Sequence, residues 1–149
     1  MQEEIKLNIY SAETDVELPI PLEEGIKAGF PSPAQDYMND SIDLNRELVR
    51  HKETTFYARV SGNSLIDAGI SNGDIVVVDK SLEAITGDYV VAFIDGEFTI
   101  KEFRLDEKNK CAWLVPYNKE FSPIKVTQEN DFMIWGVVTY TIKKMTTHF

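Results

Sequence analysis

Cysteine, histidine and long apolar runs are all scarce in this chain of 149 residues. Cys111 is the single cysteine, which excludes an internal disulfide and a cysteine-rich metal site and fits a reducing cytoplasm. The longest uninterrupted apolar run covers only residues 89–94, whereas a membrane-spanning helix needs about 20 residues. No basic start followed by an apolar stretch is found near Met1, so we expect no secretory signal. These features predict a cytoplasmic protein that does not contact a membrane.

Basic side chains are too few to balance the acidic ones. Fifteen Lys and Arg residues stand against 25 Asp and Glu residues, a net charge of −10. This balance excludes a fold-wide basic surface for phosphates and argues against direct DNA binding by the chain alone. Half of the acidic excess falls in residues 1–28, which we interpret as an extended acidic arm with one possible edge strand. The alternative is an ordinary first strand and loop of the domain.

The two histidines give no support to a metal site or to a histidine-based serine triad. His51 and His148 lie far apart and lack the His-Glu-x-x-His spacing of zinc peptidases. Neither follows a recognisable strand end, which is the usual context of a catalytic histidine. We therefore interpret both as surface residues, and we expect no metal ion and no cofactor.

Short apolar runs with an alternating pattern dominate the chain after residue 54. They predict strands over residues 56–60, 74–79, 89–94, 97–104, 111–116 and 132–142, with turns at Asn72-Gly73 and Asp95-Gly96. Helices are expected over residues 34–38 and 43–50, with Asp43 as an N-cap. The two prolines and the glycine in residues 28–33 indicate an exposed hinge. The sequence thus predicts a mainly β protein with short antiparallel strands and a few short helices.

One segment, residues 61–69, combines features that a nucleophile needs. Gly62 permits a tight turn, and Ser64 stands at the start of a short helical turn that Gly69 ends. A hydroxyl in that place has backbone N–H groups beside it, which can stabilise a developing oxyanion. The same residues also suit simple capping of the turn by Ser61, Asn63 or Ser64, and local pattern favours this simpler interpretation.

A serine nucleophile needs a base, and a lysine held neutral by burial can replace histidine. In the predicted strand after Asp95-Gly96, Thr99, Lys101 and Phe103 point to one face. The default interpretation places Lys101 on a solvated face. Lys101 becomes a candidate base only if another layer covers that face.

Taken together, these segments resemble the UmuD group of the LexA-type self-cleaving serine peptidases. The resemblance covers about residues 27–145, most of the chain, and Ser64 and Lys101 are 37 residues apart, as in that family. It is carried by AGFPSPA at 28–34, IDLN at 42–45, SGNSLID at 61–67, GISNGD at 69–74, DGEFTIK at 95–101 and GVV at 136–138.

The resemblance implies a nucleophile, a general base, an oxyanion hole and a cleavage site. Ser64 is expected to be the nucleophile and Lys101 its general base, with the backbone N–H groups of Asn63 and Ser64 as the oxyanion hole. The scissile bond is expected between Ala28 and Gly29. Self-cleavage then removes the arm, residues 1–28, and leaves residues 29–149 as the peptidase domain.

The resemblance also implies a fold and partners. The fold is expected to be the mainly β peptidase domain shared by LexA and signal peptidases, and the protein is expected to be a homodimer. Cleavage is expected to be stimulated by the RecA filament on single-stranded DNA. The shortened form is expected to join a UmuC-type DNA polymerase as an accessory subunit for translesion synthesis in the SOS response.

Two other functions remain open at this point. The chain could be a binding module for a polymerase or RecA that never cleaves itself, or it could cleave other proteins in trans. Leu65 stands where methionine is common in the family, a small change in packing beside the nucleophile. Ala28 matches the cleavage sites of LexA-type proteins.

Overall fold

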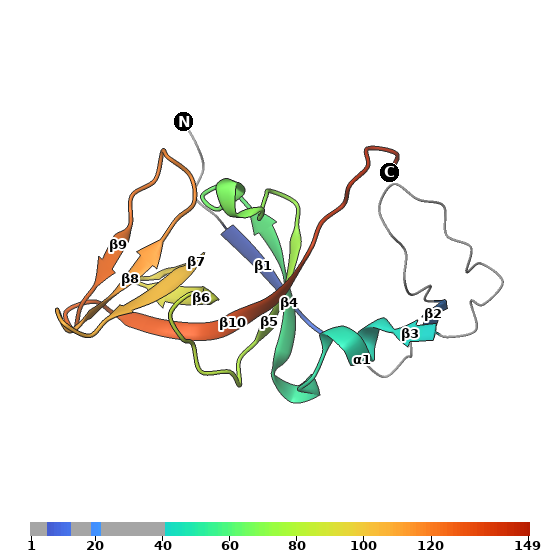
Figure 1. Ribbon diagram of the computed structural model, residues 1–149, viewed down its shortest axis with the longest axis horizontal. Helices are drawn as coiled ribbons and strands as arrows, with labels where there is room; N and C mark the ends of the chain where they lie inside the picture. Colours follow the sequence, from blue (N-terminus) through green and yellow to red (C-terminus); the bar gives the residue numbers. More distant parts are fainter. Residues whose placement is uncertain (1–5, 13–18, 22–40) are drawn as a thin grey trace.

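The computed structural model describes residues 6–12, 19–21 and 41–149 (Figure 1). The predicted hinge over residues 28–33 and the predicted helix over residues 34–38 lie outside the described residues. The boundary expected between residues 28 and 29 lies outside them as well, so the division into an arm and a peptidase domain stays a prediction.

An antiparallel sheet of eight strands forms most of the described structure, in the order β1-β4-β5-β10-β6-β7-β8-β9. The predicted mainly β fold is thereby confirmed. All the strands expected after residue 54 are present within a few residues. The bounds are β1 (Lys6–Ser11), β4 (Thr55–Ser61), β5 (Ile75–Asp79), β6 (Tyr89–Ile94), β7 (Glu97–Asp106), β8 (Cys111–Val115), β9 (Ile124–Val126) and β10 (Phe132–Ile142).

Strand β1, from the acidic stretch, pairs with β4 and forms one edge of this sheet. The possible edge strand in the acidic stretch is therefore present. Strand β9, at the opposite edge, was missed by the sequence analysis. It has only three residues, with Lys125 between two apolar ones, and such a short run lacks a recognisable period.

The described helices are short. Helix α1 (Leu44–Leu48) begins after Asp43, whose carboxylate accepts a hydrogen bond from the Asn45 N–H at 3.0 Å, as predicted for an N-cap. It ends earlier than expected because Val49 has an extended backbone. Two single-turn 3₁₀ helices follow, η2 (Lys52–Thr54) and η3 (Ile66–Ala68). A separate two-stranded sheet pairs β2 (Pro19–Pro21) with β3 (Ser41–Asp43).

The turn between β6 and β7 fixes the register of the strand that carries Lys101. Asp95 and Gly96 have φ angles of 46° and 92°, both in the left-handed region that a tight hairpin turn of type I′ requires. Ile94 therefore pairs with Glu97, and Val90 pairs with Lys101. Because side chains alternate along a strand, this register decides which face of the sheet receives the amine.

Strand β10 joins the two halves of the sheet. Its first half pairs with β6 and its second half pairs with β5, with the exchange at Gly136 and Val137 (Figure 1). The sheet curls around this strand, so that β1 at one edge contacts β7 from the other half. One apolar cluster joins β4, β5, β6 and β7 with the segment after β4 and consists of Ala58, Val60, Leu65, Ile70, Val76, Val78, Val91 and Ile100.

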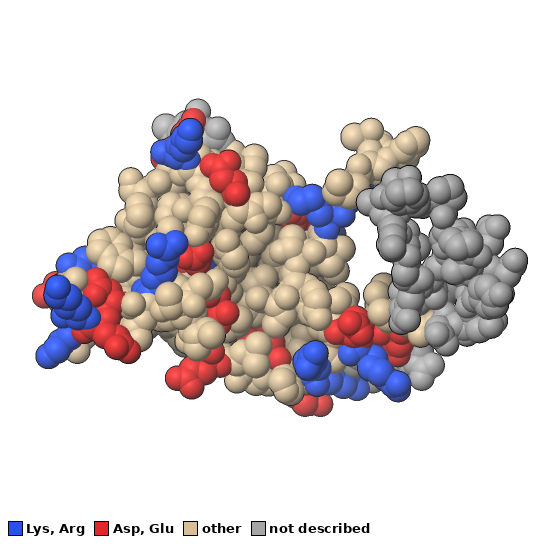
Figure 2. All heavy atoms as spheres, in the orientation of Figure 1, with Lys and Arg blue, Asp and Glu red and all other residues tan. Residues whose placement is uncertain are grey.

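The surface carries charges of both signs. Figure 2 shows basic and acidic side chains interspersed around the face in view. This mixture differs from the contiguous basic patch that a nucleic-acid-binding surface presents. No helix in the described part of the chain has the length and apolar character needed to cross a membrane.

Candidate active site

Ser64 lies in the tight segment between β4 and η3 and is completely buried, with an exposed fraction of 0%. The segment turns at Gly62, which has a φ of 97° and whose N–H donates to Asn72 Oδ1 at 3.1 Å. The capping interpretation of this segment is wrong. Helix η3 has Leu65 as its N-cap and receives no side-chain capping bond, because the Ser64 side chain points to Lys101 instead.

Lys101 is also buried, with an exposed fraction of 1%. The default interpretation, which placed this side chain on a solvated face, is therefore wrong. The reason is tertiary: the sheet curls until β1 contacts β7, and the segment after β4 brings Ser64 Oγ to 3.1 Å from Lys101 Nζ. A second layer thus covers the face of β7 that would be solvated in a flat sheet.

The amine and the hydroxyl lie within hydrogen-bond distance of each other. Lys101 Nζ is 3.1 Å from Ser64 Oγ and donates to Thr99 Oγ1 at 2.6 Å and to the Ile100 carbonyl at 3.3 Å. Two acceptors on its own strand therefore orient the amine toward the serine. Thr99 was not identified as a site residue from the sequence, although its position two residues before Lys101 places it on the same face.

This arrangement has a definite chemical capacity. Removal from water disfavours the charged ammonium relative to the neutral amine, and a neutral amine can accept the proton of a hydroxyl at this distance. The roles expected for Ser64 and Lys101 nevertheless remain predictions, as does the oxyanion hole at Asn63 and Ser64. Ala28 and Gly29 lie outside the described residues.

A polar network lies beside the site on β7. The buried carboxylate of Glu102 accepts hydrogen bonds from Arg104 Nε and from the Tyr117 hydroxyl, both at 2.5 Å. Burial by itself raises the pKa of Glu102, but the bonds from Tyr117 and Arg104 outweigh burial and lower that pKa below its ordinary value. The network therefore holds an ionised carboxylate and ties Tyr117 to the strand that carries Lys101.

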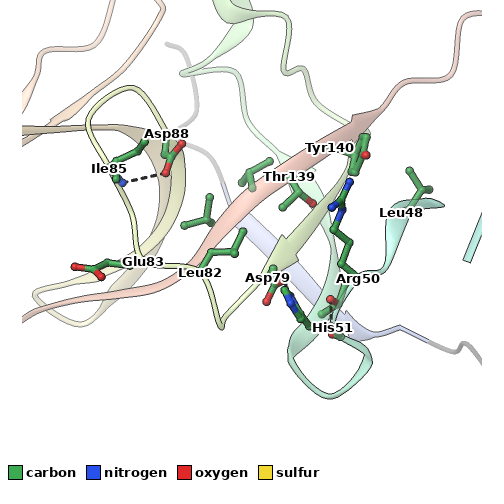
Figure 3. A pocket seen from close by; sticks show the side chains of 13 residues that line it. Leu48, Arg50, His51, Asp79, Leu82, Glu83, Ile85, Asp88, Thr139 and Tyr140 are labelled. Carbon is green, nitrogen blue, oxygen red and sulfur yellow. Dashed lines mark hydrogen bonds and ion pairs between the residues drawn. The ribbon is translucent and has the colours of Figure 1, made fainter. Parts of the chain in front are cut away.

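A separate hollow of about 420 Å³, which neither Ser64 nor Lys101 lines, lies near the end of β5 (Figure 3). His51 and Asp79 line it, and Ser81 lies beside them. These residues do not form a catalytic triad. Asp79 and Ser81 approach the same nitrogen of His51, Nδ1, at 2.6 and 3.2 Å, whereas a triad uses opposite ring nitrogens. Ser81 donates its hydroxyl directly to Asp79 at 2.7 Å.

Asp79 gives a prediction for stability against acid. Burial raises its pKa, but hydrogen bonds from His51, Ser81 and Thr54 together lower it from 3.8 to about 2. A carboxylate with a lowered pKa in the folded state stabilises the fold above its unfolded pKa, and the gain is lost as the pH falls from about 4 through about 2. Replacing Asp79 by Asn should therefore cost about 2 kcal/mol at pH 7.

This cost can be measured by urea unfolding of the wild type and of Asp79→Asn at pH 7 and at several lower values. The difference between the two proteins should shrink steadily below pH 4. A difference that does not depend on pH would contradict this account.

Metal ligands do not gather anywhere in the described ranges: no group of three or more His, Cys, Asp or Glu side chains is placed to hold an ion there. Cys111 is buried, as expected for a small apolar side chain, and His51 and His148 are exposed. The chemistry that the described residues offer is therefore concentrated at Ser64 and Lys101.

Comparison with known proteins identifies the family. The Peptidase S24-like family model matches residues 21–139. Protein MucA of Salmonella typhimurium is 45% identical over 118 residues, which cover 78% of this chain and 79% of MucA. Protein SamA of Salmonella typhimurium strain LT2 is 41% identical over 121 residues, or 81% of this chain and 82% of SamA.

A longer relative extends the similarity to repressors. The LexA repressor of Carboxydothermus hydrogenoformans is 35% identical over 116 residues, which cover 78% of this chain and 56% of the repressor. The range that the family model matches, residues 21–139, includes the segment after β4 and all of β7, which carry Ser64 and Lys101. The chain belongs to the S24-like peptidases and, within them, to the LexA/UmuD family.

Proposed function

We propose that the protein is a self-cleaving serine peptidase whose nucleophile is Ser64 and whose general base is Lys101. The observation that carries this proposal is the distance of 3.1 Å between Lys101 Nζ and Ser64 Oγ, with both side chains buried. An amine that is buried this deeply is costly to keep charged, which favours the neutral form that a general base needs. Family membership supports the same chemistry.

The proposed reaction proceeds through an acyl-enzyme. Ser64 Oγ attacks the carbonyl carbon of Ala28 while Lys101 Nζ takes the hydroxyl proton. The Ala28–Gly29 bond then breaks, and the new amine of Gly29 receives that proton. The ester left on Ser64 is hydrolysed by a water molecule that Lys101 deprotonates, which frees residues 1–28 and regenerates the site. The small side chains of Ala28 and Gly29 allow the bond to approach a crowded nucleophile.

We propose a role for the product as well. Residues 29–149 act as an accessory subunit of a UmuC-type translesion polymerase, and the chain works as a homodimer in the cytoplasm. A RecA filament on single-stranded DNA stimulates cleavage. Similarity to MucA and SamA over about four-fifths of each protein supports this context.

Mass spectrometry of the purified chain tests the proposal directly. After incubation at pH 10, the intact mass should be replaced by two masses that correspond to residues 1–28 and 29–149, because an alkaline solution favours the neutral amine. An intact chain after long incubation, with a folded spectrum by circular dichroism, would favour the non-cleaving binding module.

The rate of cleavage should depend on pH in a defined direction. Only the neutral form of Lys101 can accept the serine proton, so the first-order rate constant should rise from pH 7 toward pH 10, by up to about tenfold per unit, and then level off. Gel electrophoresis of timed samples measures it. A rate that stays flat across this range would contradict a lysine base.

A further inference from the structure

The short segment that follows β8 holds the backbone of the nucleophile loop at two successive peptide groups. The Asn118 side chain donates from Nδ2 to the Asn63 carbonyl at 2.9 Å. The backbone N–H of Tyr117 donates to the Ser64 carbonyl at 2.8 Å, and the Tyr117 carbonyl accepts from the Asp67 N–H at 2.8 Å. The first of these contacts joins residues 55 positions apart, and no local sequence pattern connects either segment's residues across that distance.

The Asn118 side chain is itself held in one orientation. Its Oδ1 accepts a hydrogen bond from the Glu120 N–H at 3.0 Å, and its carbonyl accepts one from the Phe121 N–H at 3.0 Å. With Oδ1 engaged by its own loop, the amide can present only Nδ2 to Asn63. The donor is therefore preorganised rather than one of many surface side chains that happen to reach a carbonyl.

The peptide group between Asn63 and Ser64 links this contact to the proposed chemistry. A trans peptide is planar, so its C=O and its N–H point in opposite directions. Holding the Asn63 carbonyl therefore fixes the direction of the Ser64 N–H, which is one of the two expected oxyanion donors. Within the described residues, no hydrogen bond takes up the Ser64 N–H, which leaves it able to serve a ligand oxygen.

Tyr117, whose N–H holds the Ser64 carbonyl, is also bonded to the strand that carries the base. The Tyr117 hydroxyl donates to Glu102 and accepts from Arg104 at 3.2 Å, and both residues belong to β7. The strand thus places Lys101 beside Ser64 Oγ on one face and anchors Tyr117 through the neighbouring side chains. Strand β7 therefore holds both the base and, through Tyr117, the loop that carries the oxyanion donor. Such fixed donors are what electrostatic stabilisation of an oxyanion requires.

We infer that Asn118 is a positioning residue. Together with the Ile66 N–H, which donates to the same carbonyl at 3.2 Å, it holds the Asn63 carbonyl and so aims the Ser64 N–H at the oxyanion. This inference rests on the proposed self-cleavage. Removal of the Asn118 amide should leave the nucleophile and the base in place and should weaken only the stabilisation of the tetrahedral intermediate. Asn118→Ala should lower the first-order cleavage rate constant by about tenfold to a hundredfold, as expected for misplaced catalytic groups.

Two measurements on the full chain separate this role from general loosening. The rate constant should fall by the same factor at every pH, with the midpoint of the pH–rate profile unchanged, because Lys101 is untouched. In ¹⁵N-labelled protein, the Ser64 amide signal should shift, because a hydrogen bond to a carbonyl polarises the N–H of the same peptide. The spectra are compared in a Lys101→Ala background, which prevents cleavage during recording.

Asn109→Ala is the matched control. Asn109 is an exposed loop residue that also donates from Nδ2, to Asp106 at 2.8 Å, in the turn between β7 and β8. Asn109→Ala should change neither the cleavage rate constant nor the Ser64 amide signal. If Asn118→Ala does not fold, Asn118→Ser provides the second variant, since a serine can still accept from the Glu120 N–H but is too short to reach Asn63.

The outcomes are distinct. A folded Asn118 variant that cleaves at the wild-type rate, that moves the midpoint of the profile, or that leaves the Ser64 amide signal unchanged overturns the positioning role while the proposed function stands. A wild-type chain that never cleaves refutes the proposed function, and the positioning role falls with it. A lower rate with an unchanged midpoint and a shifted Ser64 signal supports both.

Discussion

Alanine at position 64 is expected to abolish conversion of the chain into its two fragments. Ser64 Oγ forms the new bond in the proposed reaction, and the Thr99 hydroxyl also lies within hydrogen-bond distance of Lys101 Nζ. Thr99 lies on the rigid strand β7 next to the base rather than in a loop beside free N–H groups. Loss of a nucleophile costs a factor of about 10⁴ to 10⁶ in rate, so no fragment should form in days.

Replacing Lys101 should have an equal effect, and the choice of residue makes the result specific. Lys101→Met keeps most of the length of the buried side chain and removes only the amine, so packing around it is largely preserved. A folded but inactive Lys101→Met protein assigns the loss to the missing base. Lys101→Ala should be inactive as well, but it adds a cavity in the core.

Matched controls are available on the surface. Ser122 and Lys125 are both exposed, and Ser122→Ala and Lys125→Ala should cleave at the wild-type rate. Intact mass spectra at pH 10, read beside thermal unfolding curves, distinguish loss of chemistry from loss of fold. Normal processing by a Ser64→Ala or a Lys101→Met chain would remove these residues from the mechanism.

The strands were predictable because their signals are local. Alternation of apolar residues and the Asp95-Gly96 turn indicated β6 and β7 almost to the residue, since such a turn needs two positive φ angles that few dipeptides adopt. Asp43 was identified as an N-cap for a similar reason, because a short side-chain oxygen before a helix has one obvious donor to accept from.

The burial of Lys101 was not predictable from local pattern. The alternation along β7 identified the face on which the amine lies, but whether that face is covered depends on the curl of the whole sheet. Only resemblance to a family linked Lys101 with Ser64 before their distance was known. The contact between Asn118 and Asn63 left no sequence signal either, because a loop asparagine has many possible partners and most are solvent.

Gly136 is where the curl of the sheet can be tested. Strand β10 changes partners there, from β6 to β5, and the backbone of Gly136 approaches β5 closely. A Cβ at this position would lie 2.6 Å from Val78 Cγ1 and 3.4 Å from the Asp79 carbonyl oxygen. Val78 is completely buried and β-branched, so its methyl group cannot simply rotate away.

Gly136→Ala should therefore destabilise the fold by about 1 to 3 kcal/mol, the usual cost of overpacking a core. The Gly136→Ala variant should also stop cleaving at a lower temperature than the wild type. The reason is that the curled sheet brings together β4, which leads to Ser64, and β7, which carries Lys101. Urea unfolding measures the first effect, and cleavage at a series of temperatures measures the second.

A second substitution shows whether the clash with Val78 is the cause. Val78→Ala removes the methyl group that the new Cβ would meet, and it should destabilise the protein alone because it leaves a cavity. When Val78→Ala is combined with Gly136→Ala, the loss in free energy of unfolding should be clearly smaller than the sum of the two single losses, because the added methyl group fills the vacated space. Additive losses would mean that Gly136 matters for some property of the backbone other than the close approach to β5.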